Sequence, residues 1–311
     1  MINPVYSPAA GRYDGGMRYR RCGQSGVLLP EISLGMWHNF GDVNPFSNAL
    51  AMAHYAFDHG ITHFDLANNY GPSYGSAEET FGQIMKKSFR PYRDELFVAT
   101  KAGYDMWPGP YGNWGSRKSL VASLDQSLRR MNLDYVDVFY SHRYDPETPL
   151  EETMQTLVDM VRQGKALYVG ISKYPADKAA EAYRYLAEHD VHCLLYQGRY
   201  NLFDRVLDDQ GILAQARDNG AGFIAFSPLA QGLLTSRYLD GVPEDSRMAQ
   251  GRFLKREVLT GAALEKIKAL NEVASGRGQT LAEMSLAWLL KDETVTSVIV
   301  GASSVSQLED N

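Results

Sequence analysis

The feature that most constrains the fold is an alternation of short β-rich runs with amphipathic helical stretches, repeated along the whole chain. The β-rich runs are almost continuously apolar, as at 135–140 (Tyr-Val-Asp-Val-Phe-Tyr), which is typical of parallel strands covered by helices. Eight such units in 311 residues favour a closed α/β barrel, the (β/α)8 TIM barrel, over an open doubly wound sheet. We expect strands at 31–34, 61–67, 96–101, 135–142, 167–172, 193–198, 223–229 and 295–301.

Helical periodicity fills the intervals between these strands, and Ser76 followed by Glu79 predicts a capping box at the second helix. Ahead of the barrel, residues 17–30 indicate a short N-terminal β-hairpin that turns at 23–26. No Pro/Ser-rich linker interrupts the pattern, so we predict a single domain over 1–311. Helices are expected at 47–59, 77–87, 116–130, 150–163, 177–189, 208–218, 260–276 and 280–291.

Composition excludes several classes of function. The net charge of -6 argues against nucleic-acid binding, and no apolar run reaches the ~18 residues of a membrane span. With only Cys22 and Cys193, no disulfide framework is expected, and a reducing cytoplasm fits. His54, His59 and His63 cannot share one helix face, so we expect no metal site.

Chemistry-bearing side chains terminate three consecutive predicted strands. Asp65, Lys101 and His142 stand at or near these ends, and Tyr70 follows in the loop beyond Asp65. In such barrels the carboxyl ends of the strands carry the reactive groups. Each residue alone has an ordinary structural interpretation, as a loop cap, a rim side chain or a core histidine. Together they favour a catalytic site, because an inward lysine needs a charged partner and Asp65 is the obvious one.

This set suits the reduction of a carbonyl group. A tyrosine with a pKa of roughly 10 is a poor acid near neutrality, so we expect the Lys101 ammonium to lower the pKa of Tyr70 and make it a proton donor. Asp65 would orient Lys101, and His142 would polarise the carbonyl. Hydride must then come from a cofactor. Because no G-x-G-x-x-G follows a strand and no P-loop is present, a dinucleotide would be bound by barrel loops.

The pattern Asp65-x-x-x-x-Tyr70 with Lys101 and His142 resembles the catalytic tetrad of the aldo-keto reductases. The likeness runs from the Gly35 region to Asn311, nearly the whole chain, and implies the same barrel fold and a small-aldehyde substrate. One segment is similar to the cofactor loop of the branch that contains the β subunits of voltage-gated potassium channels. The matching segments outside the tetrad are 68–72, 101–112, 168–172, 200–203 and, for the cofactor loop, 226–234.

The resemblance implies NADPH (or NADP+) as the cofactor, held by strand ends and the C-terminal segment. In chain order its residues would serve the nicotinamide, then the pyrophosphate, then the adenosine end with its 2′-phosphate. Two positions depart from the family pattern: Lys173 stands where relatives commonly have Asn, and Arg237 where they have Lys. The implied residues are Trp37, Asp65, Ser172, Gln197, Phe226, Ser227, Leu229, Gln231, Arg237, Ser303, Gln307 and Asn311.

Ser303 and Ser304 follow the last strand and open a helix, which suits an anion and equally suits ordinary helix capping. Three aromatic residues after the third strand, Trp107, Tyr111 and Trp114, are expected to line the substrate mouth. Arg143 should lie on the opposite strand face from His142, so we interpret it as structural and not as a ligand of substrate phosphate. The long segment at 230–259 is expected to be functional.

The sequence therefore predicts a cytoplasmic, homo-oligomeric, NADPH-dependent reductase of small aldehydes, L-glyceraldehyde 3-phosphate or methylglyoxal among them. The alternative is a redox-sensing regulatory subunit of a potassium channel with slow turnover; the complete tetrad favours the enzyme. A phosphate-binding isomerase barrel would leave the tetrad unexplained. Relatives continue through a last barrel helix, so this helix looks truncated here, and we expect the natural protein to extend past Asn311.

Overall fold

Eight parallel strands form a closed barrel, which confirms the predicted fold. The computed structural model describes residues 6–239, 241–242, 248, 251 and 256–311. The strands follow one another around the barrel in chain order, and the last pairs with the first through Val298 and Ile32. They are β3 (Ile32–Gly35), β4 (His63–Asp65), β5 (Phe97–Ala102), β6 (Val136–Ser141), β7 (Ala166–Ser172), β8 (Cys193–Arg199), β9 (Gly222–Phe226) and β10 (Val295–Val300).

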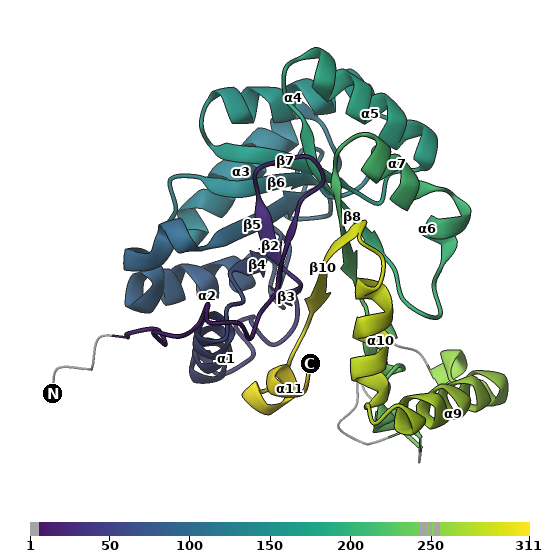
Figure 1. Ribbon diagram of the computed structural model, residues 1–311. Helices are drawn as coiled ribbons and strands as arrows, with labels where there is room; N and C mark the ends of the chain where they lie inside the picture. The colour runs from purple at the N-terminus through teal and green to yellow at the C-terminus, as the bar shows by residue number, and fades with distance from the viewer. Residues whose placement is uncertain (1–5, 240, 243–247, 249–250, 252–255) are drawn as a thin grey trace, which may run out of the picture.

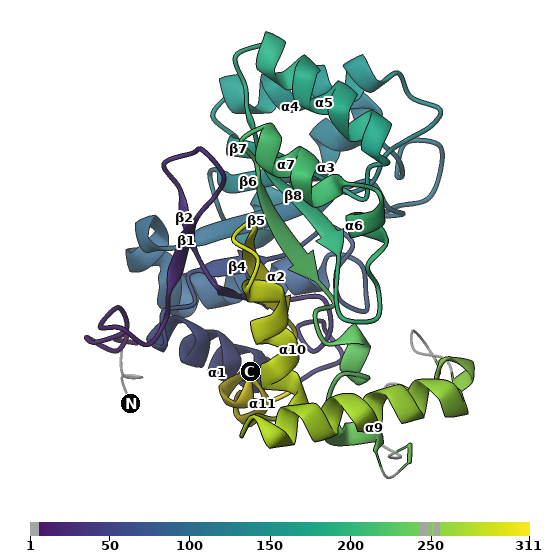
Figure 2. The ribbon, with the colours of Figure 1, turned by 45° about the vertical axis from the view of Figure 1, so that its right-hand side comes forward.

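Helices surround the strands, and α9 lies outside this ring next to α10 (Figures 1 and 2). Apolar side chains between the strands and the helices form the larger part of the core, as the uninterrupted apolar strands predict. In the part of the chain that is described, no helix is long and apolar enough to cross a membrane. The helices are α1 (Phe46–Asp58), α2 (Ser76–Ile84), α3 (Arg117–Met131), α4 (Leu150–Arg162), α5 (Ala176–Glu188), α6 (Val206–Asp209), α7 (Ile212–Asp218), α9 (Gly261–Gly276), α10 (Leu281–Leu290) and α11 (Val305–Asp310).

Two local predictions about helices are wrong. Ser76 does not cap α2: it is the first helical residue, its hydroxyl donates to the Ser73 carbonyl, and Gly75 with φ 89° precedes it. The helix expected at 208–218 is two helices, because Gly211 adopts φ 70° between α6 and α7. Of the long segment at 230–259, residues 240, 243–247, 249–250 and 252–255 lie outside the described residues.

The predicted hairpin closes the amino end of the barrel. Its strands β1 (Tyr19–Arg21) and β2 (Leu28–Pro30) pair antiparallel. Cys22 and Leu29 are fully buried against side chains of the barrel strands, and a Cβ on Gly23 would lie 2.0 Å from the Gly220 carbonyl oxygen. The hairpin therefore covers this end, so a ligand must enter from the carboxyl ends of the strands.

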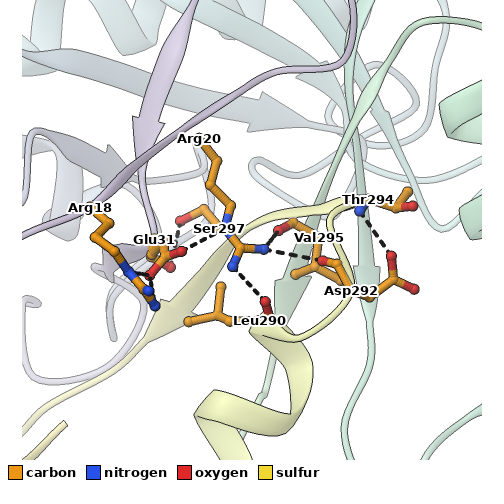
Figure 3. Close-up of polar contacts among 8 residues, drawn as sticks. All are labelled: Arg18, Arg20, Glu31, Leu290, Asp292, Thr294, Val295 and Ser297. Carbon is orange, nitrogen blue, oxygen red and sulfur yellow. Dashed lines mark hydrogen bonds and ion pairs between the residues drawn. The ribbon is translucent and has the colours of Figure 1, made fainter.

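Arg20 of the hairpin fastens β10 to the end of α10 (Figure 3). Its guanidinium donates to the Leu290 carbonyl, to the Asp292 and Val295 carbonyls at 3.1 and 3.0 Å, and to Glu31 Oε1 at 2.6 Å. These carbonyls belong to the carboxyl end of α10 and the start of β10, where helical partners run out. One side chain thus donates to three backbone carbonyls at the junction of α10 and β10.

Arg20→Met is expected to lower the free energy of unfolding by about 2 kcal/mol, because buried Glu31 keeps only its bond from exposed Arg18 and three backbone carbonyls lose a charged donor. Arg18 is a matched control, since it also bonds Glu31 but its side chain is 76% exposed against 21% for Arg20. Arg18→Met should cost less than about 1 kcal/mol. Urea unfolding measures both variants, and equal losses would contradict the role given to Arg20.

Candidate active site

The predicted ion pair lies at the carboxyl ends of β4 and β5. Lys101 Nζ donates to Asp65 Oδ2 at 2.7 Å and to the Leu66 carbonyl at 2.6 Å, and both charged side chains are buried. The other oxygen of Asp65 accepts from Gln197 Nε2 at 2.9 Å. Asp65 is the last residue of its strand and the parallel pairing of β4 with β5 brings Lys101 to it, so the strand register itself creates the pair. Gln197 on β8 reaches it across the barrel.

Tyr70 and His142 complete the group. The phenol oxygen of Tyr70 lies 3.5 Å from Lys101 Nζ. Its ring stacks on Trp37 at 5.9 Å between centroids, and the His142 ring meets it edge-on, also at 5.9 Å. His142 directly follows β6 and is buried. All four residues of the predicted tetrad therefore gather at one point of the barrel mouth.

The pKa of Tyr70 is shifted in the opposite direction from the one expected. Burial raises the pKa of Tyr70 well above its ordinary value, and the charge of Asp65 adds to this; the predicted lowering by Lys101 does not prevail. Burial lowers the pKa of His142, and Lys101 and two further cations add to this. Burial also lowers the pKa of Lys101, which Asp65 opposes. Near neutral pH the site therefore presents a phenol and a neutral imidazole.

A cavity of about 530 Å³ opens beside the tetrad. It runs from Asp65 and Tyr70 on one side of the mouth to the segment that follows β10. The loop that follows β9 also lines the cavity. Its backbone is left-handed at Ser227 and Gln231, with φ 53° and 60°, and such strained residues often occur at functional sites. The predicted cofactor residues that line the cavity are Trp37, Asp65, Phe226, Ser227, Leu229, Gln231, Arg237, Ser303 and Gln307.

The remaining predicted cofactor residues, Ser172, Gln197 and Asn311, do not line this cavity. Ser172 ends β7, is fully buried, and has a hydroxyl oxygen without a hydrogen-bond partner among the described residues. Asn311 Nδ2 likewise has none. An orphaned buried hydroxyl is costly, and an amide-bearing ligand would relieve the cost at Ser172. The lining of the cavity fits a nicotinamide dinucleotide, and the Ser172 hydroxyl, which is not part of that lining, is a candidate contact for its amide end.

At the far end of the cavity, Ser303 and Ser304 take part in ordinary helix capping. Ser304 accepts the Gln307 backbone N–H as the N-cap of α11, and Ser303 donates its backbone N–H to Gln307 Oε1 at 2.8 Å. Sequence reasoning overlooked lining residues in the loop after β3, Asn39 and Asn44 among them. Their position just beyond a barrel strand is the signal that could have indicated them.

Arg143 organises the loop that forms the outer wall of the site, 103–115. Its guanidinium donates to the Gly103 carbonyl at 2.8 Å and to Asn113 Oδ1 at 2.7 Å, and it lies 4.2 Å from the Tyr104 ring and 3.5 Å from the Trp114 ring. These contacts agree with the structural interpretation of Arg143.

The aromatic ring of this wall nearest the tetrad was not anticipated. Tyr104 packs edge-on against His142 with 4.7 Å between ring centroids. None of the three aromatic residues expected at the mouth, Trp107, Tyr111 and Trp114, lines the cavity beside the tetrad: the Trp114 ring packs against Arg143, and Tyr111 is exposed beneath Lys118. Tyr104 follows Lys101 by only three residues, just beyond the end of β5, and that proximity is the signal that could have identified it.

Of the three histidines rejected as metal ligands from the sequence, His59 contacts the Tyr55 carbonyl, and the other two contact serines. His54 Nε2 lies 2.8 Å from Ser88 Oγ, and His63 Nδ1 lies 2.7 Å from Ser33 Oγ inside the barrel. Burial lowers the pKa of His63 to about 4, so its imidazole is neutral. These two side chains therefore serve packing and internal hydrogen bonding.

Comparison with known proteins identifies the family. A model of the aldo/keto reductase family matches residues 31–311. The chain belongs to the aldo/keto reductase family. This aldo/keto reductase is 57% identical over 301 residues to L-glyceraldehyde 3-phosphate reductase of Escherichia coli O157:H7, covering 96% of this chain and 87% of the relative. Its counterpart in strain K12 is 56% identical over the same length.

A second group of relatives is more distant. A probable voltage-gated potassium channel subunit beta of Arabidopsis thaliana is 35% identical over 302 residues, with 95% of this chain and 90% of the relative covered. Family membership and the first relatives make this aldo/keto reductase an oxidoreductase, and enzymes of the family use a nicotinamide cofactor.

Proposed function

We propose that this protein is an NADPH-dependent reductase of small aldehydes, with L-glyceraldehyde 3-phosphate as the first substrate to test and methylglyoxal as the second. The observation that carries the proposal is the placement of Tyr70, within 3.5 Å of Lys101 Nζ and lining the 530 Å³ cavity. The name of the relatives that are 56–57% identical supports the choice of first substrate.

The chain's own residues account for the proton half of the reaction. When bound, the cofactor supplies hydride to the carbonyl carbon. The buried phenol of Tyr70, which is protonated at neutral pH, donates its proton to the carbonyl oxygen. Lys101 stabilises the negative charge that develops on the phenol oxygen. His142, neutral and packed beside Tyr70, orients the carbonyl.

Other residues of the chain would hold the cofactor. Trp37 and Phe226, which line the cavity, would border the nicotinamide. Ser172 does not line the cavity, and its buried, unpartnered hydroxyl would bind the carboxamide where the nicotinamide reaches it. The loop after β9, through Ser227, Leu229 and Gln231, would hold the pyrophosphate. Ser303 and Gln307 would hold the adenosine end.

NADPH is expected to bind at least about tenfold more tightly than NADH, because a 2′-phosphate gains a charge-assisted hydrogen bond. Among the described residues that line the cavity, Asp65 is the only acidic one, and it is paired with Lys101 at the opposite end from Ser303. Fluorescence quenching gives both dissociation constants. Arg237→Met should reduce the preference, whereas Arg217→Met, on α7 away from the cavity, should not. Comparable constants for the two cofactors would contradict the assignment.

The competing function is a regulatory channel subunit with slow turnover, suggested by relatives at 35% identity. Steady-state oxidation of NADPH with L-glyceraldehyde 3-phosphate and with methylglyoxal separates the two functions. A reductase should turn over at about 1 s⁻¹ or faster, within the ordinary range for enzymes. Turnover orders of magnitude slower with both aldehydes would favour the regulatory subunit.

A further inference from the structure

Lys173 occupies a position between the outer wall of the site and the cofactor loop. It directly follows β7 with left-handed backbone, φ 56°, and is exposed. Its ammonium donates to the Tyr104 phenol oxygen at 3.0 Å and lies 4.7 Å from the Tyr104 ring and 5.2 Å from the Phe226 ring. The charge therefore lies against two aromatic side chains, one in the loop 103–115 and the other at the end of β9.

The other cations around the mouth are already committed. Lys101 is paired with Asp65, the guanidinium of Arg143 is occupied by the wall loop, and Arg199 pairs with Asp204 at 3.0 Å. For Lys173, by contrast, the part of the chain that the structure describes supplies a phenol and two ring faces but no carboxylate within ion-pair distance. Apart from Arg237, which lines the cavity and is proposed for the cofactor phosphate, Lys173 is the described cation near the tetrad whose charge a substrate anion could neutralise.

Space and reach both allow such a ligand. Lys173 is exposed and lines a second cavity of about 410 Å³, which is separate from the cavity beside the tetrad and leaves room for a phosphate group next to Lys173. Tyr104 contacts Lys173 on one side and His142 on the other, with 4.7 Å between the Tyr104 and His142 ring centroids. The ammonium thus stands one phenol ring away from the tetrad. In a three-carbon aldehyde 3-phosphate, the phosphorus is four bonds from the carbonyl carbon, roughly 5 Å at about 1.5 Å per bond.

We propose that Lys173 binds the phosphate of a short phosphorylated aldehyde and makes the enzyme select such substrates over neutral aldehydes. The proposal rests on the proposed reductase function and adds its specificity-determining residue. Lys173 also contributes to the field of positive charge at the site, since together with Lys101 and Arg143 it lowers the pKa of His142. A dianionic substrate would be attracted by the same field.

Lys173→Met is expected to lower the ratio of kcat/KM for L-glyceraldehyde 3-phosphate to kcat/KM for L-glyceraldehyde by at least about tenfold, the size of one charge-assisted hydrogen bond. The loss should be mainly in KM for the phosphorylated substrate, and Lys173→Arg should restore most of the ratio. Lys118→Met is the matched control. Lys118 is also an exposed lysine over an aromatic ring of the wall loop, 5.1 Å from Tyr111, and its loss should leave the ratio unchanged.

Two results would overturn the proposal. An equal loss with both aldehydes would mean that Lys173 only holds Tyr104 and Phe226 in place. An unchanged ratio with weaker NADPH binding, measured by fluorescence quenching, would make Lys173 a cofactor residue.

Failure of the reductase function itself is detected separately, with the native protein. If that protein reduces neither aldehyde, calorimetric binding of glycerol 3-phosphate to the NADPH-loaded protein still decides the role of Lys173. Binding that is weakened at least about tenfold in Lys173→Met supports the phosphate site. Absent binding, or equal binding in both proteins, refutes it.

Discussion

Tyr70→Phe is expected to lower kcat by about 10²–10⁴-fold, the usual contribution of general acid catalysis, while the dissociation constant for NADPH stays nearly unchanged. The substitution removes one oxygen atom and leaves the ring that stacks on Trp37 and meets His142 edge-on. Only the group that donates the proton is lost, so the effect should fall on the chemical step. Steady-state kinetics with methylglyoxal, with single-turnover measurements, would establish this.

Tyr74→Phe is the matched control, because Tyr74 lies in the same loop with its side chain largely in solvent. Its kcat should equal that of the native enzyme. A Tyr70→Phe variant that works within a few-fold of the native rate would remove Tyr70 from the mechanism.

The kcat of the native enzyme should be independent of pH between about pH 6 and about pH 8. Burial raises the pKa of Tyr70 and lowers that of His142, so neither group titrates in this window.

The barrel could be predicted because each strand carries its own signal. Apolar runs such as that of β6 need cover on both faces, and eight of them separated by helices admit few architectures. The tetrad was predictable for a related reason. A carboxylate and an ammonium at the ends of neighbouring apolar strands each have an ordinary explanation alone, but an inward lysine needs a charged partner, and this requirement indicated the pairing of Asp65 with Lys101.

Contacts between distant segments could not be predicted in this way. The bond from Gln197 to Asp65 crosses the barrel, and Arg20 reaches carbonyls about 270 residues further along the chain. No local pattern encodes such pairings. The position of Tyr104 against His142 depends on a wall loop held by Arg143, and a loop of this kind has no periodicity to read.

The direction of the pKa shift at Tyr70 could not be predicted from the sequence either. The nearness of Lys101 was inferred correctly, but the depth of burial was not, and burial dominates the pKa of the phenol. In the proposed mechanism, Lys101 therefore acts less by preparing a phenolate than by stabilising the one that forms when the proton leaves. The distinction matters for the effect of removing Lys101.

Lys101→Met is expected to lower kcat to a degree similar to Tyr70→Phe and to destabilise the protein by about 3 kcal/mol. The stability loss follows because Asp65, almost fully buried, would keep only its bond from Gln197, and a buried carboxylate without its partner is costly. The kinetic loss follows because Nζ, 3.5 Å from the phenol oxygen, would no longer oppose the charge that develops there. Urea unfolding and steady-state kinetics on the folded variant separate the two effects.

The double variant Tyr70→Phe with Lys101→Met distinguishes a shared role from two separate ones. If Lys101 acts on the reaction through the Tyr70 oxygen, it has little left to stabilise once that oxygen is gone. The double variant should then be about as slow as the slower single variant, and the two losses in activation free energy should be far from additive. Lys101→Met with Asp65→Asn removes both buried charges and should recover part of the stability without recovering kcat. Additive kinetic losses in the first pair would mean that the ammonium and the phenol serve the reaction independently, contrary to the mechanism proposed here.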